Sequence, residues 1–182
     1  MFLDVCKGAW FIHHKGFIHR DLKPDNIFLK TNDDPDSSRK EVAKIGDLGT
    51  TKEIQFTVAR TKVATKLYAA PEFFIYDTVG QDFDTWSLGV ILYEIMTLCK
   101  PFKNEKRIKK IKYDRKLIGD KQIRNIVEHI FQQDAAKRPL VKQIVKELIK
   151  ILNAMGENIT YKELKKDIRK GKMKRSDEAS LM

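Results

Sequence analysis

The side chains that could do chemistry in this sequence are concentrated in one short stretch, His19–Asn26. It places an imidazole, a guanidinium, two carboxylates, an ammonium and a carboxamide within eight residues, around a single proline. Apolar segments flank the stretch, Phe17-Ile18 before it and Ile27-Phe28-Leu29 after it. So many polar groups between segments that we expect to be buried indicate a loop held rigidly at a cleft, where catalytic residues are commonly found.

Further motifs follow this loop along the chain. They are Asp47-Leu48-Gly49, Ala70-Pro71-Glu72, the stretch from Asp84 to Gly89, and later Arg138-Pro139. Each motif alone is a weak indication, because three letters such as Asp-Leu-Gly occur by chance. In this order and spacing, together with the H-R-D-L-x-x-x-N pattern of the loop, they are specific. Residues 1–152 therefore resemble the large C-terminal lobe of a eukaryotic protein kinase.

The resemblance implies a serine/threonine kinase that transfers the γ-phosphate of ATP to Ser or Thr of protein substrates, with Mg²⁺ as the metal. Asp21 would accept the proton of the substrate hydroxyl, and Lys23 would contact the transferred phosphate. Asn26 and Asp47 would hold Mg²⁺, a hard cation that takes amide and carboxylate oxygens. Phe28 is similar to the residue that packs beneath the adenine, so Lys23, Phe28 and Asp47 would form the ATP site. A lysine at position 23 is typical of the serine/threonine type, and the tyrosine-kinase-like group is one branch that the resemblance leaves open.

Two threonines in the segment 49–72 are connected with control and catalysis by the same resemblance. Counting back from Glu72, Thr61 aligns with the usual activating phosphorylation site, and Arg20 is similar to the arginine that pairs with such a phosphate. We therefore expect an upstream kinase to act on Thr61. Thr65 aligns with the threonine that bonds the catalytic aspartate and lysine. For both threonines, an ordinary polar loop residue is the alternative reading of the sequence.

The remaining landmarks have structural roles in the resemblance. Glu72 and Arg138 are similar to a buried ion pair that ties the segment before the central helix to the last helices. Asp84 would bond backbone amides of the catalytic loop, and it also falls where a carboxylate can cap the central helix. His19 would be a hydrogen-bonded histidine of the core rather than a catalytic one. Leu48 replaces the phenylalanine usual in the family, and we expect this change to be tolerated because the side chain stays apolar.

The elements that must position these residues are mostly helical. Apolar stripes at a 3.6-residue period predict three helices, over residues 2–14, 123–131 and 140–152. The run from Trp86 to Leu98 is apolar almost all the way round, which predicts a buried central helix. Two short apolar runs, 27–29 and 42–45, predict a pair of strands around a polar turn, while residues 49–72 lack periodicity. The expected fold class is mainly α, a kinase-like C-lobe of helices around a central buried helix, with a small β-ribbon at the cleft.

The net charge of +11 comes from two stretches rather than from the whole chain. Residues 103–116 and 162–175 each hold eight Lys/Arg against two Asp/Glu. A solvated face and a loose tail are the simple interpretation, so we divide the chain into a domain over 1–152 and a basic C-terminal tail over 153–182. We do not expect nucleic acid as a partner, because Tyr161 is the only stacking aromatic near the second stretch.

Composition limits the class of protein further. The 182 residues are 42% hydrophobic and 34% charged, which is typical of one globular domain. Two cysteines without a C-x-x-C pattern support neither a disulfide framework nor a zinc site, and they favour a reducing compartment. The start of the chain does not resemble a signal peptide, and the most apolar run is too short to span a bilayer. We therefore expect a cytoplasmic protein, with the nucleus as an alternative, and no membrane partner.

Parts of a complete kinase do not occur in this sequence. It contains no G-x-G-x-x-G loop and no V-A-I-K strand, and the helix over 2–14 is already in register at Met1 without a capping residue. Two hypotheses follow. The chain is a piece of an active kinase whose small N-terminal lobe lies upstream, or it is a non-catalytic, kinase-like interaction module. The presence of Asp21, Lys23, Asn26 and Asp47 together favours the first, since a binding module has no need of all four. In either case we expect this chain alone to be inactive, because the small lobe closes the ATP cleft.

Overall fold

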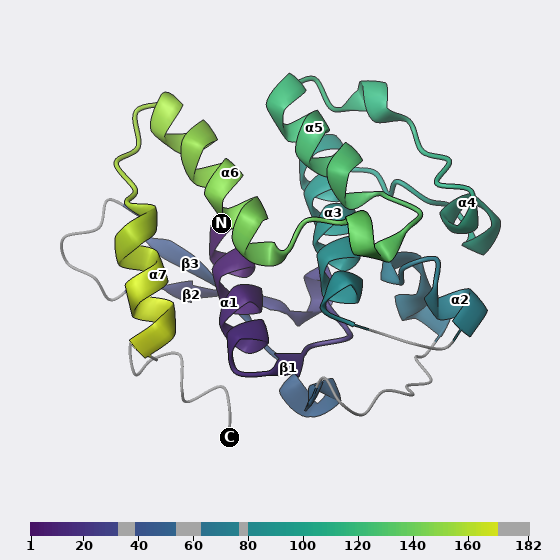
Figure 1. Cartoon of the computed structure of the whole chain (residues 1–182). Helices are drawn as coiled ribbons and strands as arrows, with labels where there is room; N and C mark the ends of the chain where they lie inside the picture. Colours follow the sequence, from purple (N-terminus) through teal and green to yellow (C-terminus); the bar gives the residue numbers. More distant parts are fainter. Residues whose placement is uncertain (33–38, 54–62, 77–79, 171–182) are drawn as a thin grey trace.

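The computed structural model describes residues 1–32, 39–53, 63–76 and 80–170 (Figure 1). Over these ranges the chain is mainly α-helical with two small antiparallel strand pairs, which confirms the expected fold class. The α-helices are α1 (Phe2–His14), α2 (Phe73–Tyr76), α3 (Gln81–Thr97), α4 (Glu105–Lys109), α5 (Lys121–Ile130), α6 (Val141–Ala154) and α7 (Tyr161–Lys170). The strands are β1 (Phe17–Ile18), β2 (Ile27–Thr31), β3 (Glu41–Ile45) and β4 (Lys52–Glu53).

Helix α3 runs through the middle of the molecule (Figure 1). Every residue from Phe83 to Tyr93 is buried, as the all-round apolar pattern predicts. The ring of Trp86 packs on Phe102 and Phe131, with centroids 5.4 and 4.7 Å away. Gly89 is required on this helix because a Cβ there would overlap the Ile130 side chain of α5. The helix begins at Gln81, five residues before the predicted apolar run. The apolar pattern did not reveal this first turn, because the turn contains Gln81, Asp82 and Asp84.

Helix α1 covers one side of the centre and has the predicted bounds. The helix contacts β3, α6 and α7, and also α3 and β1. The helix ends at His14, and two residues later Gly16 has a φ of +84°, a conformation that glycine adopts without strain. The chain then turns into β1 and the polar loop, and Asp84 of α3 bonds the first two residues of that loop.

Strand β1 precedes the polar loop and β2 follows it, and each pairs with a strand further along the chain. Strands β2 and β3 pair from Ile27↔Ile45 to Thr31↔Glu41, as predicted, and the turn at 33–38 lies outside the described residues. Strands β1 and β4 pair through Phe17↔Glu53 and Ile18↔Lys52, which the sequence did not reveal. The second pair ties part of the segment 49–72 to the residues just before the loop.

The C-terminal region contains more structure than a loose tail. The side chain of Asn153 exchanges two hydrogen bonds with the backbone of Ile159, 2.9 and 3.0 Å long. Helix α7 follows and packs on α1, where Tyr161 stacks on Trp10 at 5.7 Å between ring centroids and Ile168 is buried. The domain boundary at residue 152 stays a prediction, but residues 161–170 form a docked helix. Residues 171–182 lie outside the described part.

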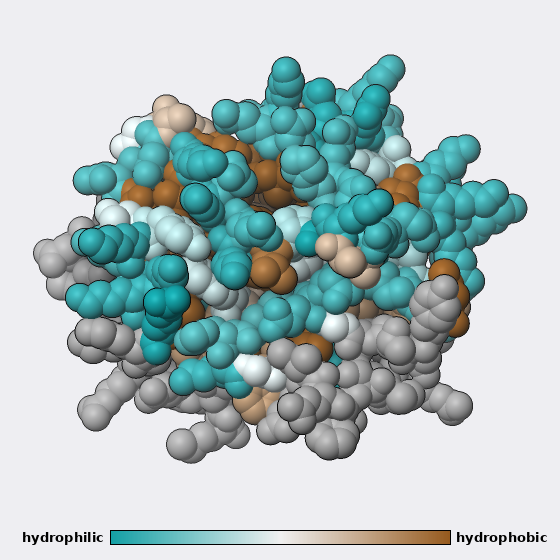
Figure 2. Space-filling model, in the orientation of Figure 1, coloured by the Kyte–Doolittle hydropathy of each residue, from teal (hydrophilic) through white to brown (hydrophobic). Residues whose placement is uncertain are grey.

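The visible surface is predominantly polar, with apolar side chains in separate spots (Figure 2). None of the described helices is long and apolar enough to cross a membrane.

Candidate active site

The polar loop brings three of the predicted site residues into direct contact. Asp21 is 9% exposed, and its Oδ2 accepts a hydrogen bond from Lys23 Nζ at 2.7 Å. Asn26, in the 3-10 turn that ends the loop, donates through Nδ2 to the same oxygen at 3.1 Å and to the Asp21 carbonyl at 2.8 Å. The carboxylate is therefore held by two side chains through one of its oxygens.

The other carboxylate oxygen of Asp21, Oδ1, differs from Oδ2 in its hydrogen bonding. Oδ1 is buried and has no hydrogen-bond partner among the described residues. Leaving a buried acceptor unsatisfied typically costs about 1–3 kcal/mol, so such an atom requires an explanation, and a catalytic role is one. An ionised carboxylate with a free lone pair can accept a proton from, or orient, a hydroxyl group that enters the cleft.

Asp84 of α3 holds the beginning of the loop. Its carboxylate accepts the backbone N–H groups of His19 and Arg20 and the Nε2–H of His13, each at 2.8 Å. Burial alone raises the pKa of Asp84, but the hydrogen bond and charge of His13 and the hydrogen bond from the His19 amide together bring it below the usual 3.8. Arg20 has a φ of +71°, which costs a non-glycine residue about 1–2 kcal/mol. The hydrogen bond from the Arg20 backbone N–H to Asp84 offsets that strain.

The expected role of Asp84 at the loop is thus confirmed, whereas its expected role as a helix cap was wrong. Helix α3 has Gly80 as its N-cap residue and begins at Gln81, which places Asp84 in the fourth helical position. From there its carboxylate points to the loop and makes no cap hydrogen bond. The sequence showed an acid near the helix start but not which residue begins the helix.

Two histidines support this arrangement. His19 is fully buried, as predicted, and its Nδ1 accepts the Asp21 amide at 3.3 Å while its Nε2 donates to the Gly46 carbonyl at 3.0 Å. These bonds require a neutral ring with the proton on Nε2. His13 was missed as a supporting residue by sequence reasoning, which placed it on the helical stripe of α1. A buried histidine at the end of an apolar stripe was the one signal that it needs a polar partner.

Three of the predicted metal and nucleotide residues, Asn26, Phe28 and Asp47, lie next to Gly46 at the end of β3. The Gly46 amide donates to the Asn26 carbonyl at 2.9 Å and so joins the end of β3 to the end of the polar loop. Asp47 is the next residue after Gly46. Asp47 is exposed and left-handed, with φ +53° and ψ +61°. Phe28 is 55% exposed, and its ring packs against Gly46 so closely that a Cβ there would overlap it. Leu48, in the position of the family's phenylalanine, is half-buried.

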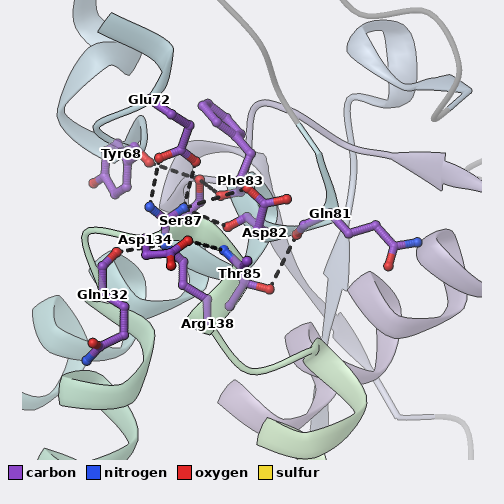
Figure 3. Close-up of polar contacts among 11 residues, drawn as sticks. Tyr68, Glu72, Gln81, Asp82, Phe83, Thr85, Ser87, Gln132, Asp134 and Arg138 are labelled. Carbon is purple, nitrogen blue, oxygen red and sulfur yellow. Dashed lines mark hydrogen bonds and ion pairs between the residues drawn. The ribbon is translucent and has the colours of Figure 1, made fainter. Parts of the chain in front are cut away.

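The ion pair between Glu72 and Arg138 is present as expected (Figure 3). Both terminal guanidinium nitrogens of Arg138 donate to the carboxylate, at 2.6 and 2.7 Å, and the arginine side chain is 0% exposed. The guanidinium also lies over the Trp86 ring, 4.9 Å from its centroid, and its Nε donates to the Gln132 carbonyl. The pair therefore joins the segment before α2 to the loop before α6 across the central helix.

The side chains of two predicted site residues, Thr61 and Thr65, are not among those that the structure describes. Thr61 lies outside the described residues. Thr65 belongs to the 3-10 turn Val63–Tyr68, and only its backbone is described. That turn is attached to α3, since Ser87 Oγ donates to the Tyr68 carbonyl at 2.9 Å and Tyr68 donates to Glu94 at 2.7 Å. The proposed contacts of Thr65 with Asp21 and Lys23 stay a prediction.

Comparison with known proteins gives the family of the chain. A sequence model described as "Protein kinase domain" matches residues 1–166. Serine/threonine-protein kinase nekl-2 of Caenorhabditis elegans is 32% identical over 154 residues, which cover 80% of this chain and 41% of that protein. Human serine/threonine-protein kinase Nek5 is 30% identical over 80% of this chain and 21% of its own length. Ovarian-specific serine/threonine-protein kinase Lok of Drosophila melanogaster is 38% identical over 57% of this chain and 22% of its length.

The chain belongs to the protein kinase family. It spans less than half the length of these curated relatives.

Proposed function

We propose that this chain is the large-lobe part of a protein serine/threonine kinase, which moves the γ-phosphate of ATP to Ser or Thr of protein substrates when complete. The observation that carries the proposal is the buried, unpartnered Oδ1 of Asp21, beside an Oδ2 held by Lys23 and Asn26. A structural aspartate would satisfy both oxygens, because an unpaired buried acceptor destabilises the fold. A base that awaits a hydroxyl group keeps one oxygen free.

The neighbouring residues fit the nucleotide and metal that this reaction uses. Asn26 uses its amide N–H groups on Asp21, which leaves its Oδ1 as the atom able to face a cation. Mg²⁺ binds through few protein oxygens and keeps several waters, so Asn26 and Asp47 are sufficient ligands. Bound Mg²⁺ would neutralise charge on the ATP phosphates. Lys23 carries a positive charge beside Asp21 for the transferred phosphate, and the exposed Phe28 ring offers an apolar surface for adenine.

The serine/threonine type is supported by the names of all three relatives and by the lysine two residues after Asp21. Membership of a finer branch, the tyrosine-kinase-like group included, stays a prediction. We further propose cytoplasmic placement, consistent with two cysteines that are both free, and activation by an upstream kinase acting on Thr61. Phosphopeptide mapping of protein from cells tests the last point, and Thr61 found always unmodified contradicts it.

We also propose that residues 1–182 alone do not transfer phosphate. Kinase activity needs a lysine–glutamate pair and a covering lobe above the phosphates. Purified 1–182 incubated with Mg·ATP should therefore show no autophosphorylation, and robust incorporation of γ-phosphate would overturn this expectation. The nucleotide sequence upstream of Met1 shows whether a reading frame with a glycine-rich loop precedes it.

The decisive experiment uses the longest protein that this reading frame encodes. Phosphate transfer from ATP to a mixture of Ser- and Thr-containing peptides should fall on the order of 10²–10⁴-fold in Asp21→Asn, the usual contribution of a positioned base. Asp167→Asn is the matched control, because Asp167 is exposed on α7, and it should keep full activity. Equal activity of wild type and Asp21→Asn would reject the catalytic role. A well-folded wild type without any transfer would favour the non-catalytic interaction module instead.

A further inference from the structure

A small pocket lies on the side of α1 that faces away from the β2–β3 ribbon, where the last turn of α1 meets the first residues of α3 and α6. Its volume is about 110 Å³. Trp10, His13 and Val141, all buried, form its floor, and Gln81 lines it from the start of α3. Figure 3 shows Gln81 extending away from the Arg138 cluster, and its Nε2 donates to the His13 carbonyl at 3.3 Å. The pocket is separate from the candidate active site, since Asp21 and Asp47 do not line it.

The rim of the pocket is apolar on one side and cationic on the other. Leu140 is 44% exposed there, and His14 and Lys142 are exposed beside it. No ion pair of Lys142 occurs within the described part of the chain, and no Asp or Glu is among the described residues that line the pocket. A ligand that fits would therefore present a flat apolar body to the floor and a negative charge to the rim.

The size of the pocket limits that ligand to about one ring. A closed apolar cavity of about 150 Å³ holds benzene, so a somewhat smaller pocket that opens to solvent suits one aromatic ring with its polar group outside. We propose that this pocket binds a small aromatic carboxylate, with the ring against Trp10 and Val141 and the carboxylate at Lys142. The proposal goes beyond phosphoryl transfer and does not depend on it.

The position of the pocket gives its occupant a route to the catalytic loop. A ring seated on the floor touches His13, and His13 donates to Asp84, which accepts the amides of His19 and Arg20. The occupant is thus separated from the backbone of the loop by two successive hydrogen bonds, both at 2.8 Å.

Benzoate is the probe for the test, and the two tryptophans of the chain make the readout simple. The experiment titrates benzoate into ¹⁵N-labelled 1–182 and follows the indole N–H signals of Trp10 and of Trp86, which is fully buried in the core. We expect a saturable shift of the Trp10 signal with a dissociation constant on the order of 1 mM, as for a ligand of this size, and no shift of Trp86.

Variants and a neutral analogue separate this site from general charge attraction. Lys142→Glu should weaken benzoate binding at least about tenfold, whereas Lys146→Glu, the same change one turn further along α6, should leave it within about twofold. Benzamide, which has the same ring without the charge, should bind about tenfold more weakly than benzoate. The proposal is overturned if benzoate causes no Trp10 shift up to about 20 mM, if benzamide binds equally well, or if both lysine variants weaken binding alike.

Discussion

The ion pair between Glu72 and Arg138 allows a quantitative test of what holds this fold together. Glu72→Ala removes both hydrogen bonds to a guanidinium that is 0% exposed. Breaking a buried pair by removing one partner typically costs about 3–5 kcal/mol, because the remaining charge is left uncompensated. Here Asp82, whose Oδ2 is 3.8 Å from Arg138, remains as a partial partner. We therefore expect a loss near the lower limit, about 3 kcal/mol of unfolding free energy.

Thermal unfolding of 1–182 followed by circular dichroism measures this loss. For a chain of this length, about 3 kcal/mol lowers the midpoint by roughly 6–12 °C. Asp21→Ala should change stability by no more than about 1 kcal/mol, because it removes two hydrogen bonds but also an unsatisfied buried oxygen. Glu128→Ala is the matched surface control, since its ion pair with Arg115 is exposed and such pairs contribute about 0–1 kcal/mol.

Equal melting shifts for Glu72→Ala and Asp21→Ala would refute this reasoning, as would a Glu72→Ala shift no larger than that of Glu128→Ala. A double variant separates the cost of leaving the Arg138 charge unpaired from the cost of losing its hydrogen bonds to Glu72. Adding Arg138→Met to Glu72→Ala removes the unpaired guanidinium, so the double variant should be more stable than Glu72→Ala alone.

Three other substitutions test separate parts of the structure. Leu98 ends α3 with φ +56° and is 90% exposed, so Leu98→Gly should raise the unfolding free energy in urea by about 0.5–1 kcal/mol, and a loss would contradict the strain argument. Burial, with the charge of Glu72, raises the pKa of Asp82 above 3.8, so its ionised form costs stability at neutral pH. Asp82→Asn should therefore be more stable than wild type at about pH 7, with an advantage that shrinks as the pH falls through the raised pKa toward about 4; an advantage independent of pH would reject this. Ile168→Ala should cost about 2 kcal/mol or more and reduce amide exchange protection over 161–170, whereas Asp167→Asn should do neither; unchanged protection in Ile168→Ala would show that α7 does not depend on this contact.

The sequence predicted those parts of the fold that leave a periodic or ordered trace. The stripe over residues 2–14 and the all-round apolar run of α3 identified two helices, and the ordered motifs led to the contacts of Asp84 with the loop and of Glu72 with Arg138. Such patterns are visible because they repeat at 3.6 residues or because several motifs occur in order.

The features that were missed depend on partners far away in the chain. His13 bonds Asp84 across 71 residues, and the β1–β4 pair has only two residues per strand, too few to show an alternating pattern. Helix α7 was hidden by its lysines, although Tyr161, Leu164 and Ile168 fall at i, i+3 and i+7 and pack on the core. The lysine-rich composition reflects only the exposed face of α7, whereas its three apolar side chains determine how it packs on α1.

The loop and its support differ in how completely their polar groups are satisfied, and this difference separates chemistry from stability. Asp84 uses its carboxylate on three donors, which lowers its pKa and fixes Arg20 in a strained conformation. Asp21, two residues after the first amide that Asp84 binds, keeps a buried oxygen unpaired. An unpaired oxygen and a strained backbone persist only when the surroundings over-determine them. Because α3 is buried throughout Phe83–Tyr93, it can supply that constraint. Substituting Asp84 should therefore damage stability and the active site together, whereas substituting Asp21 should damage the active site alone.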